Sequence, residues 1–111
     1  MKLPRDALIA AEKLTRYLLV KRPVGDKSEF LEKAGYTLEN WQHLEQDLRE
    51  QLLSRDAVLI ERTEYGELFE IRGSLVGPKG VVLGVRTVWM RERESGVTKF
   101  ITLYPDKRSP A

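Results

Sequence analysis

Arg86, a fixed cation in the middle of an apolar segment, is the residue most suggestive of chemistry. In residues 81–91 the larger apolar side chains occupy the odd positions, so a strand here would bury that face and place Arg86 on the open one. A guanidinium group there can bind a phosphate through paired hydrogen bonds. The structural alternative is that Arg86 caps the sheet edge or forms an ion pair with a carboxylate such as Glu70.

Two N-terminal groups also suit a phosphate-bearing ligand. Lys13, Arg16 and Tyr17 are three or four residues apart, which places them on one flank of a helix. A cation beside an aromatic ring can hold a phosphate and stack on a base. Lys27 ends a basic loop, residues 22–27, that lacks the spacing of a Walker phosphate-binding loop. The alternative for all four residues is an ordinary solvated surface.

The last expected strand, residues 98–104, contains a third group of candidate site residues. Alternation assigns positions 101 and 103 to the core. Phe100, Thr102 and Tyr104 then share the open face with the strand arginine. This assignment depends on register, because a shift of one residue exchanges the two faces.

Composition excludes several kinds of site. The chain has no cysteine, which excludes disulfides and thiolate metal ligands, and its single histidine, His43, lies on the flank of an acidic helix. Two-histidine ribonuclease chemistry and histidine-rich metal centres are therefore impossible. The acidic residues show no metal-ligand spacing, and no nucleophile elbow is present. We expect neither a metal nor another cofactor.

Charge is distributed unevenly, although the formal net charge is only +2. Basic residues outnumber acidic ones in residues 1–27 and 81–111, and the reverse holds in residues 28–56. If the first helix packs near the last strands, the two ends share a basic face suited to a polyanion such as RNA. A solvated surface of mixed charge is the alternative.

Hydrophobic periodicity changes from helical to strand-like halfway along the chain. Three- and four-residue spacing predicts a helix from Pro4 to about Leu19 and a longer one over residues 38–52, with Thr37 as its N-cap. A short helix that stops at Gly35 lies between them. Residues 58–60 are interpreted as a buried strand, and strands at 68–72, 81–91 and 98–104 follow after short turns.

These elements predict an α+β fold in which two to three N-terminal helices pack on one face of a four-stranded antiparallel meander sheet. The length fits one domain over residues 1–111, helical through 56, a sheet over 57–105 and a tail over 106–111. No apolar run approaches the roughly 20 residues that span a bilayer. With no signal-peptide core either, we expect a cytoplasmic protein without a membrane partner. The oligomeric state stays open.

Five segments resemble, in order, the motifs of a small bacterial family of unknown function. They are KLTRYLL at 13–19, PVGDKSEF at 23–30, GYTLENW at 35–41, VRTVW at 85–89 and TLYP at 102–105. That family is similar to a wider ribonuclease-like superfamily, which includes barnase, EndoU, the tRNA-cleaving colicins and RelE. The chain departs from the pattern by lacking the histidine that many of these proteins use and by carrying Leu31 where a second aromatic is usual.

The resemblance implies a toxin-like nuclease with helices before a sheet. Its active positions would be a basic residue on the first helix, an arginine on a middle strand and a serine or threonine on the last strand. Carried over, the catalytic residues are Lys13, Tyr17, Arg86 and Thr102. Arg16, Lys27 and Tyr104 would contact RNA.

The resulting hypothesis is a metal-independent endoribonuclease. Arg86 would stabilise transition-state charge, Lys13 or Tyr17 would assist proton transfer, and Thr102 would position the phosphate. A cognate antitoxin or immunity protein would be the protein partner. The alternative hypothesis is a non-catalytic protein-interaction module, of the immunity, antitoxin or phage-associated kind, that uses the acidic helix and the sheet edges.

Overall fold

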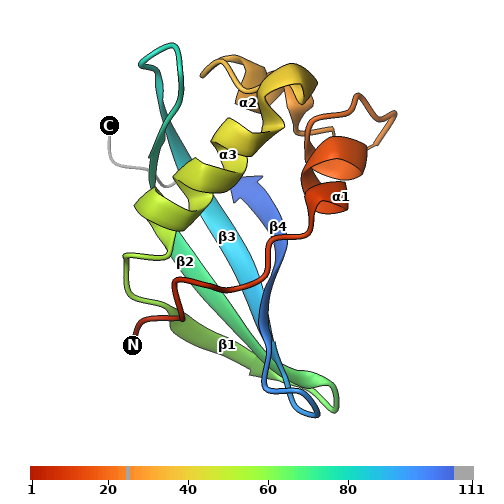
Figure 1. Ribbon diagram of the computed structural model, residues 1–111, viewed down its shortest axis with the longest axis vertical. Coiled ribbons are helices and arrows are strands. Elements are labelled where there is room, and N and C mark those ends of the chain that lie inside the picture. The colour runs from red at the N-terminus through yellow and green to blue at the C-terminus, as the bar shows by residue number, and fades with distance from the viewer. Residues whose placement is uncertain (25, 107–111) are drawn as a thin grey trace.

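Helices come first along the chain and strands second, and the helices pack on one face of the sheet, as the sequence predicts (Figure 1). The computed structural model describes residues 1–24 and 26–106. The helical elements are α1 Ala11–Lys13, the π-helical turn η1 Leu14–Leu18, α2 Ser28–Glu32, the 3-10 turn η2 Leu38–Asn40, α3 Trp41–Asp47 and the π-helical turn η3 Leu48–Leu52. The strands are β1 Val58–Arg62, β2 Gly66–Val76, β3 Val82–Glu92 and β4 Thr98–Pro105. Within the described ranges, no helix has the length and apolar character needed to cross a membrane.

The N-terminal segment is extended, so the prediction that the first helix starts at Pro4 is wrong. The Leu8 N–H donates to the Thr98 carbonyl at 2.8 Å, and the Phe100 N–H donates to the Leu8 carbonyl at 2.8 Å. Ala7 and Ile9 are buried while Leu8 is exposed, which is the two-residue alternation of a strand. The segment therefore covers the outer edge of β4, and the helix starts only at Ala11.

The boundary between α2 and η2 follows the predicted signals. Gly35 adopts a φ of 99°, a left-handed conformation that ends α2 at little steric cost for a glycine. Thr37 then forms a capping box with Asn40, whose Oδ1 accepts from the Thr37 N–H at 2.7 Å. Asn40 thus takes the role that glutamate or glutamine usually fills.

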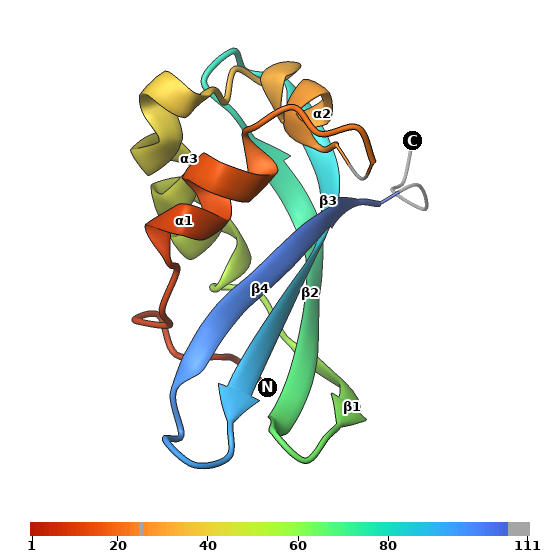
Figure 2. The same ribbon diagram turned by 90° about the vertical axis from the view of Figure 1, so that its right-hand side faces the viewer.

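The strands pair in the order β1-β2-β3-β4, all antiparallel, and leave one face of the sheet without helices (Figure 2). On the covered face, Trp89 packs edge-on against Phe100 with ring centroids 5.2 Å apart. The buried Thr87 hydroxyl accepts from Trp89 Nε1 at 2.8 Å and donates to the Ile71 carbonyl at 3.0 Å. These bonds satisfy the polar atoms that the core encloses.

A β-bulge in β4 overturns part of the predicted facing. Val88 pairs with Thr102 but Trp89 pairs with Phe100, so Ile101 is an extra residue with no partner in the register. Phe100 is consequently in the core at 2% exposure, and Ile101 is half-buried. The predicted facing of these two residues is therefore wrong, because strict alternation cannot anticipate a bulge.

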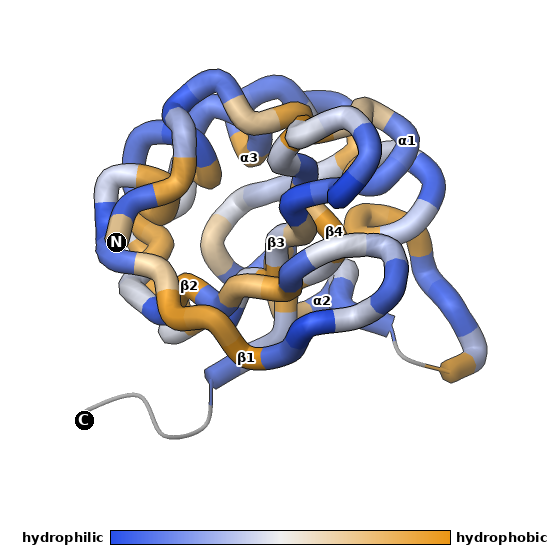
Figure 3. Tube along the Cα trace, turned by 90° about the horizontal axis from the view of Figure 1, so that it is seen from below, coloured by the Kyte–Doolittle hydropathy of each residue, from blue (hydrophilic) through white to orange (hydrophobic). Residues whose placement is uncertain are grey.

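The expectation of a buried first strand is also wrong. All five residues of β1 are exposed, including Val58 at 62% and Ile60 at 48%. Figure 3 shows β1 as a hydrophobic stretch at the edge of the sheet. An apolar run of this length fits an edge strand as well as a buried one, and periodicity alone does not distinguish them.

A buried tyrosine–carboxylate bond ties the helices to the sheet. The Tyr36 hydroxyl donates to Asp47 Oδ2 at 2.6 Å and also lies 3.2 Å from the Val76 carbonyl of β2. His43 Nε2 lies 3.2 Å from the same carboxylate oxygen. Burial, together with the bond to Asp47, raises the pKa of Tyr36 well above its ordinary range, so the hydroxyl stays protonated as a donor.

We expect Tyr36→Phe to destabilise the fold by about 1–3 kcal/mol, because it leaves the mostly buried Asp47 carboxylate without its strongest donor. Urea denaturation followed by circular dichroism measures the change. Tyr65→Phe is the matched control, since Tyr65 is 70% exposed and its ring borders solvent. Equal denaturation midpoints for the two variants would contradict a stabilising role for the buried bond.

Candidate functional site

Five side chains from four separate segments meet at the end of the open sheet face where β4 terminates. Tyr17 comes from η1, Lys27 from the loop before α2, Arg86 from β3, and Thr102 and Tyr104 from β4. In Figure 2 the loop between η1 and α2 reaches toward the C-terminal end of β4. We refer to Tyr17, Lys27, Arg86, Thr102 and Tyr104 as the tyrosine–cation cluster.

Lys27 is at the centre of this cluster. Its ammonium group donates to the Tyr17 hydroxyl at 3.1 Å and lies 3.4 Å from Thr102 Oγ1. It also lies 4.5 Å from the centroid of the Tyr104 ring, within the range of a cation–π interaction. One lysine therefore contacts three of the other four members and joins the N-terminal loop to the last strand.

Arg86 approaches the cluster from β3. Its guanidinium carbon lies 4.8 Å from the Tyr104 ring centroid, and its side chain is 39% exposed. Nη1 of Arg86 lies 3.4 Å from Glu70 Oε2, so the ion pair that the sequence analysis gave as the structural alternative is present. The same arginine also belongs to the cluster through its contact with Tyr104, so an ion pair with Glu70 and a place in the candidate site are compatible.

The cations around Tyr17 change its acidity. The hydrogen bonds with Lys27 and Thr102 are the main causes that lower the pKa of Tyr17 below its ordinary value, and burial opposes them. The positive charges of Lys27 and Arg22 lower the pKa further. The Arg22 guanidinium lies 4.9 Å from the Tyr17 ring centroid. A tyrosine in this setting ionises more readily and can accept a proton from a ligand.

Two of the predicted site residues stand outside the cluster. Lys13 in α1 and Arg16 in η1 make no side-chain hydrogen bond, ion pair or cation–π contact within the described part of the chain. Lys27 is predicted from the sequence only as an RNA contact. In the structure it lies beside Tyr17, where Lys13 was expected. The loop that carries Lys27 has no periodicity, so its path could not be predicted.

Three neighbouring residues were not predicted as site residues. Arg22 lies over Tyr17, as described above, and Arg72 and Glu70 lie on β2 beside Arg86. Arg72 Nε donates to Glu70 Oε1 at 2.8 Å. Charged residues two apart on a strand share a face, so the Glu70–Arg72 spacing was the available signal for the last two.

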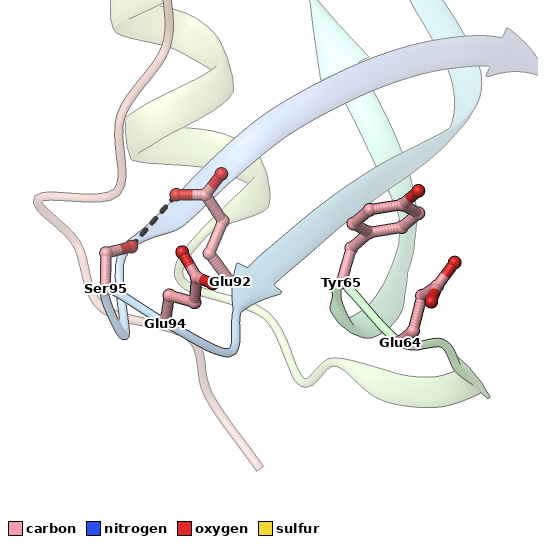
Figure 4. A pocket seen from close by; sticks show the side chains of 5 residues that line it. All are labelled: Glu64, Tyr65, Glu92, Glu94 and Ser95. Atoms are coloured by element: carbon pink, nitrogen blue, oxygen red, sulfur yellow. Dashed lines mark hydrogen bonds between the residues drawn. The ribbon is translucent and has the colours of Figure 1, made fainter.

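A surface hollow of about 330 Å³ lies at the opposite end of the sheet, between the β1–β2 and β3–β4 turns (Figure 4). It is lined by Glu64, Tyr65, Glu92, Glu94 and Ser95. The hydrogen bonds from Lys99 and Ser95 lower the pKa of Glu92, which keeps that carboxylate charged. Three carboxylates repel a polyanion, so this hollow is a poorer phosphate site than the tyrosine–cation cluster.

Across residues 1–24 and 26–106, no three His, Cys, Asp or Glu side chains are grouped to hold a metal ion.

Comparison with known proteins places the chain in a family. A comparison with curated proteins gives no significant match. Among solved structures, a chain from a contact-dependent growth inhibition toxin–immunity protein complex of Klebsiella pneumoniae 342 has the same fold, with a TM-score of 0.62 and 16% sequence identity. The match covers 90% of this chain and 100% of that one. A family profile matches residues 2–107, and the chain thus belongs to the family described as "Domain of unknown function (DUF6883)".

Proposed function

We propose that this chain is a toxin-like, metal-independent endoribonuclease whose active site is the tyrosine–cation cluster. The observation that carries the proposal is the convergence of an acidified tyrosine, Tyr17, with the cations Lys27 and Arg86 on an otherwise open sheet face. The fold similarity to a chain from a toxin–immunity complex supports a place in such a system. A cognate immunity or antitoxin protein would be its protein partner.

The chemistry is a transesterification within the RNA strand. Tyr17, in its ionised form, takes the proton from a ribose 2′-hydroxyl, whose oxygen then attacks the adjacent phosphorus. The bond from phosphorus to the 5′ oxygen breaks, and that oxygen takes a proton from water. The products are a 2′,3′-cyclic phosphate and a 5′-hydroxyl end.

The remaining members of the cluster have distinct roles in this step. Arg86 donates to the phosphoryl oxygens, which gain negative charge in the transition state. Thr102 positions the phosphate, and Tyr104 offers a ring, 37% exposed, on which a base can stack. Lys27 holds Tyr17 in its reactive form. The sequence predicts Lys13 or Tyr17 for proton transfer; in this proposal Tyr17 transfers the proton and Lys27 activates it.

We expect Arg86→Ala to reduce cleavage by about 10²- to 10³-fold, because it removes a cation that acts on transition-state charge. Expression from a tightly regulated bacterial promoter, with sequencing of new RNA 5′ ends, measures the effect in cells. Arg5→Ala is the control, since Arg5 is exposed on the N-terminal segment. Normal growth and intact RNA with the folded parent chain would overturn the proposed function.

The pKa of Tyr17 provides a test that does not depend on turnover. We expect Lys27→Ala to move Tyr17 ionisation to higher pH, because the hydrogen bond and the positive charge of Lys27 both lower the pKa of Tyr17. Tyrosinate absorbance across alkaline pH, with Tyr17→Phe identifying the signal, measures the shift. If Tyr17 is the base, the pH–activity curve of Lys27→Ala shifts in the same direction. Unchanged ionisation would exclude Lys27 as the activating group.

The exposed β1 edge favours a second candidate, a protein-interaction module. Val58, Leu59 and Ile60 are exposed on an edge strand whose outer backbone groups can pair with another strand. The partner would be a cognate immunity-type protein that adds an extended strand at β1. Under this candidate the tyrosine–cation cluster has no chemical role.

We expect Ile60→Lys to weaken binding of the protein encoded by the neighbouring gene by at least about tenfold under this second candidate, because an edge lysine opposes strand addition. Isothermal titration calorimetry measures the affinity. Arg86→Ala is the matched variant, because it changes the tyrosine–cation cluster and leaves the β1 edge intact. Equal affinities for Ile60→Lys and the parent chain would eliminate β1 as the interface.

A further inference from the structure

Two arginines face each other on the open side of the sheet next to the tyrosine–cation cluster. The register pairs Arg72 of β2 with Arg86 of β3, and Arg86 with Tyr104 of β4, so the three side chains form one row across the strands. Like charges directly opposite each other on neighbouring strands destabilise a sheet. Their presence here therefore needs a compensating group.

Glu70 supplies that compensation. Its Oε1 accepts from Arg72 Nε at 2.8 Å, and its Oε2 lies 3.4 Å from Arg86 Nη1. The Glu70 side chain is only 15% exposed, whereas those of Arg72 and Arg86 are 35% and 39% exposed. One mostly buried carboxylate thus orients two guanidinium groups whose other N–H donors have no protein partner within the described residues.

The row extends further than one phosphate can reach. Neighbouring strands are about 4.8 Å apart, so Arg72 on β2 is roughly 10 Å from Tyr104 in the same row on β4. Thr102 lies two residues further along β4, outside this row. A phosphate held by Arg86 and Thr102 leaves the terminal N–H donors of Arg72 for the next phosphate along the strand. Guanidinium groups bind phosphate oxygens through paired, charge-assisted hydrogen bonds, which gives Arg72 a defined ligand.

We propose that Arg72, oriented by Glu70, forms a second phosphate subsite, so the ligand is a polynucleotide strand that spans at least two consecutive phosphates. This inference rests on the proposed function, because it takes the tyrosine–cation cluster as the site of the first phosphate. Arg72 is a binding residue in this scheme, and Glu70 is a positioning residue that aligns both guanidinium groups.

Binding of 2′-O-methyl oligoribonucleotides tests the subsite without cleavage, since these strands lack the attacking hydroxyl. For single strands the logarithm of affinity falls with the logarithm of salt concentration by about 0.7 per neutralised phosphate. With an octanucleotide we expect Arg72→Ala to reduce this slope by about 0.7 and affinity roughly tenfold. A dinucleoside monophosphate, followed by nuclear magnetic resonance titration, should bind both proteins equally.

Arg72→Gln retains much of the side-chain packing and serves as the second variant, and Arg5→Ala is the exposed-arginine control. If Arg72→Gln and Arg5→Ala give the same salt slope as the parent chain, the subsite is excluded even where the parent cleaves RNA. If the slope falls in both Arg72 variants but unmodified RNA stays intact with the parent, the subsite stands and the nuclease proposal fails. If the parent binds no octanucleotide, both fail.

Discussion

The bulge at Ile101 is the constraint on which the candidate site depends. β4 must bury Phe100 against Trp89 and, two residues later, present Thr102 on the opposite face of the sheet. Regular alternation would place both residues on the same face. One extra residue resolves the conflict, and it lets a single strand serve both the hydrophobic core and the polar cluster.

Electrostatics on the open face follow from that placement. Thr102 and Tyr104 give Lys27 two contacts on β4, and the lysine in turn contacts Tyr17 of the first helix. Aromatic rings and hydroxyls, which need not carry charge, separate the cations here. Among the described residues, the carboxylate of Glu70 pairs with both Arg72 and Arg86, and two cations on one carboxylate give this face a positive character that attracts anions.

The sequence predicted the class of fold and the sheet order because strong local signals mark them. Turns at Gly77–Gly80 and Gly96, the Thr37 cap and the alternation around Arg86 are all local in the chain. The wrong predictions concern features set by tertiary context. β1 is apolar yet exposed, the segment before Ala11 pairs with β4, and the bulge exchanges Phe100 and Ile101.

The difference between local signals and tertiary context also explains which residues of the candidate site could be predicted. Arg86 and Thr102 were identifiable as candidates because strand alternation and the family resemblance both indicate a face and a residue type. Lys27 could not be placed beside Tyr17 from sequence, because the loop between them has no periodic pattern and the contact joins residues ten apart in the chain. Arg72 was overlooked because an arginine two residues from a glutamate is also an ordinary surface pair. Glu70 was predicted only as a possible ion-pair partner of Arg86.

The pairing of Leu8 with the beginning of β4 has a consequence for protein synthesis. The first helix and β4 build the cluster together, so the cluster cannot form until residues 102–104 have left the ribosome. Before β4 emerges, residues 17 and 27 belong to an incomplete surface that lacks its partners from the sheet. Whatever chemistry the cluster supports therefore becomes available only once β4 has taken its place in the sheet.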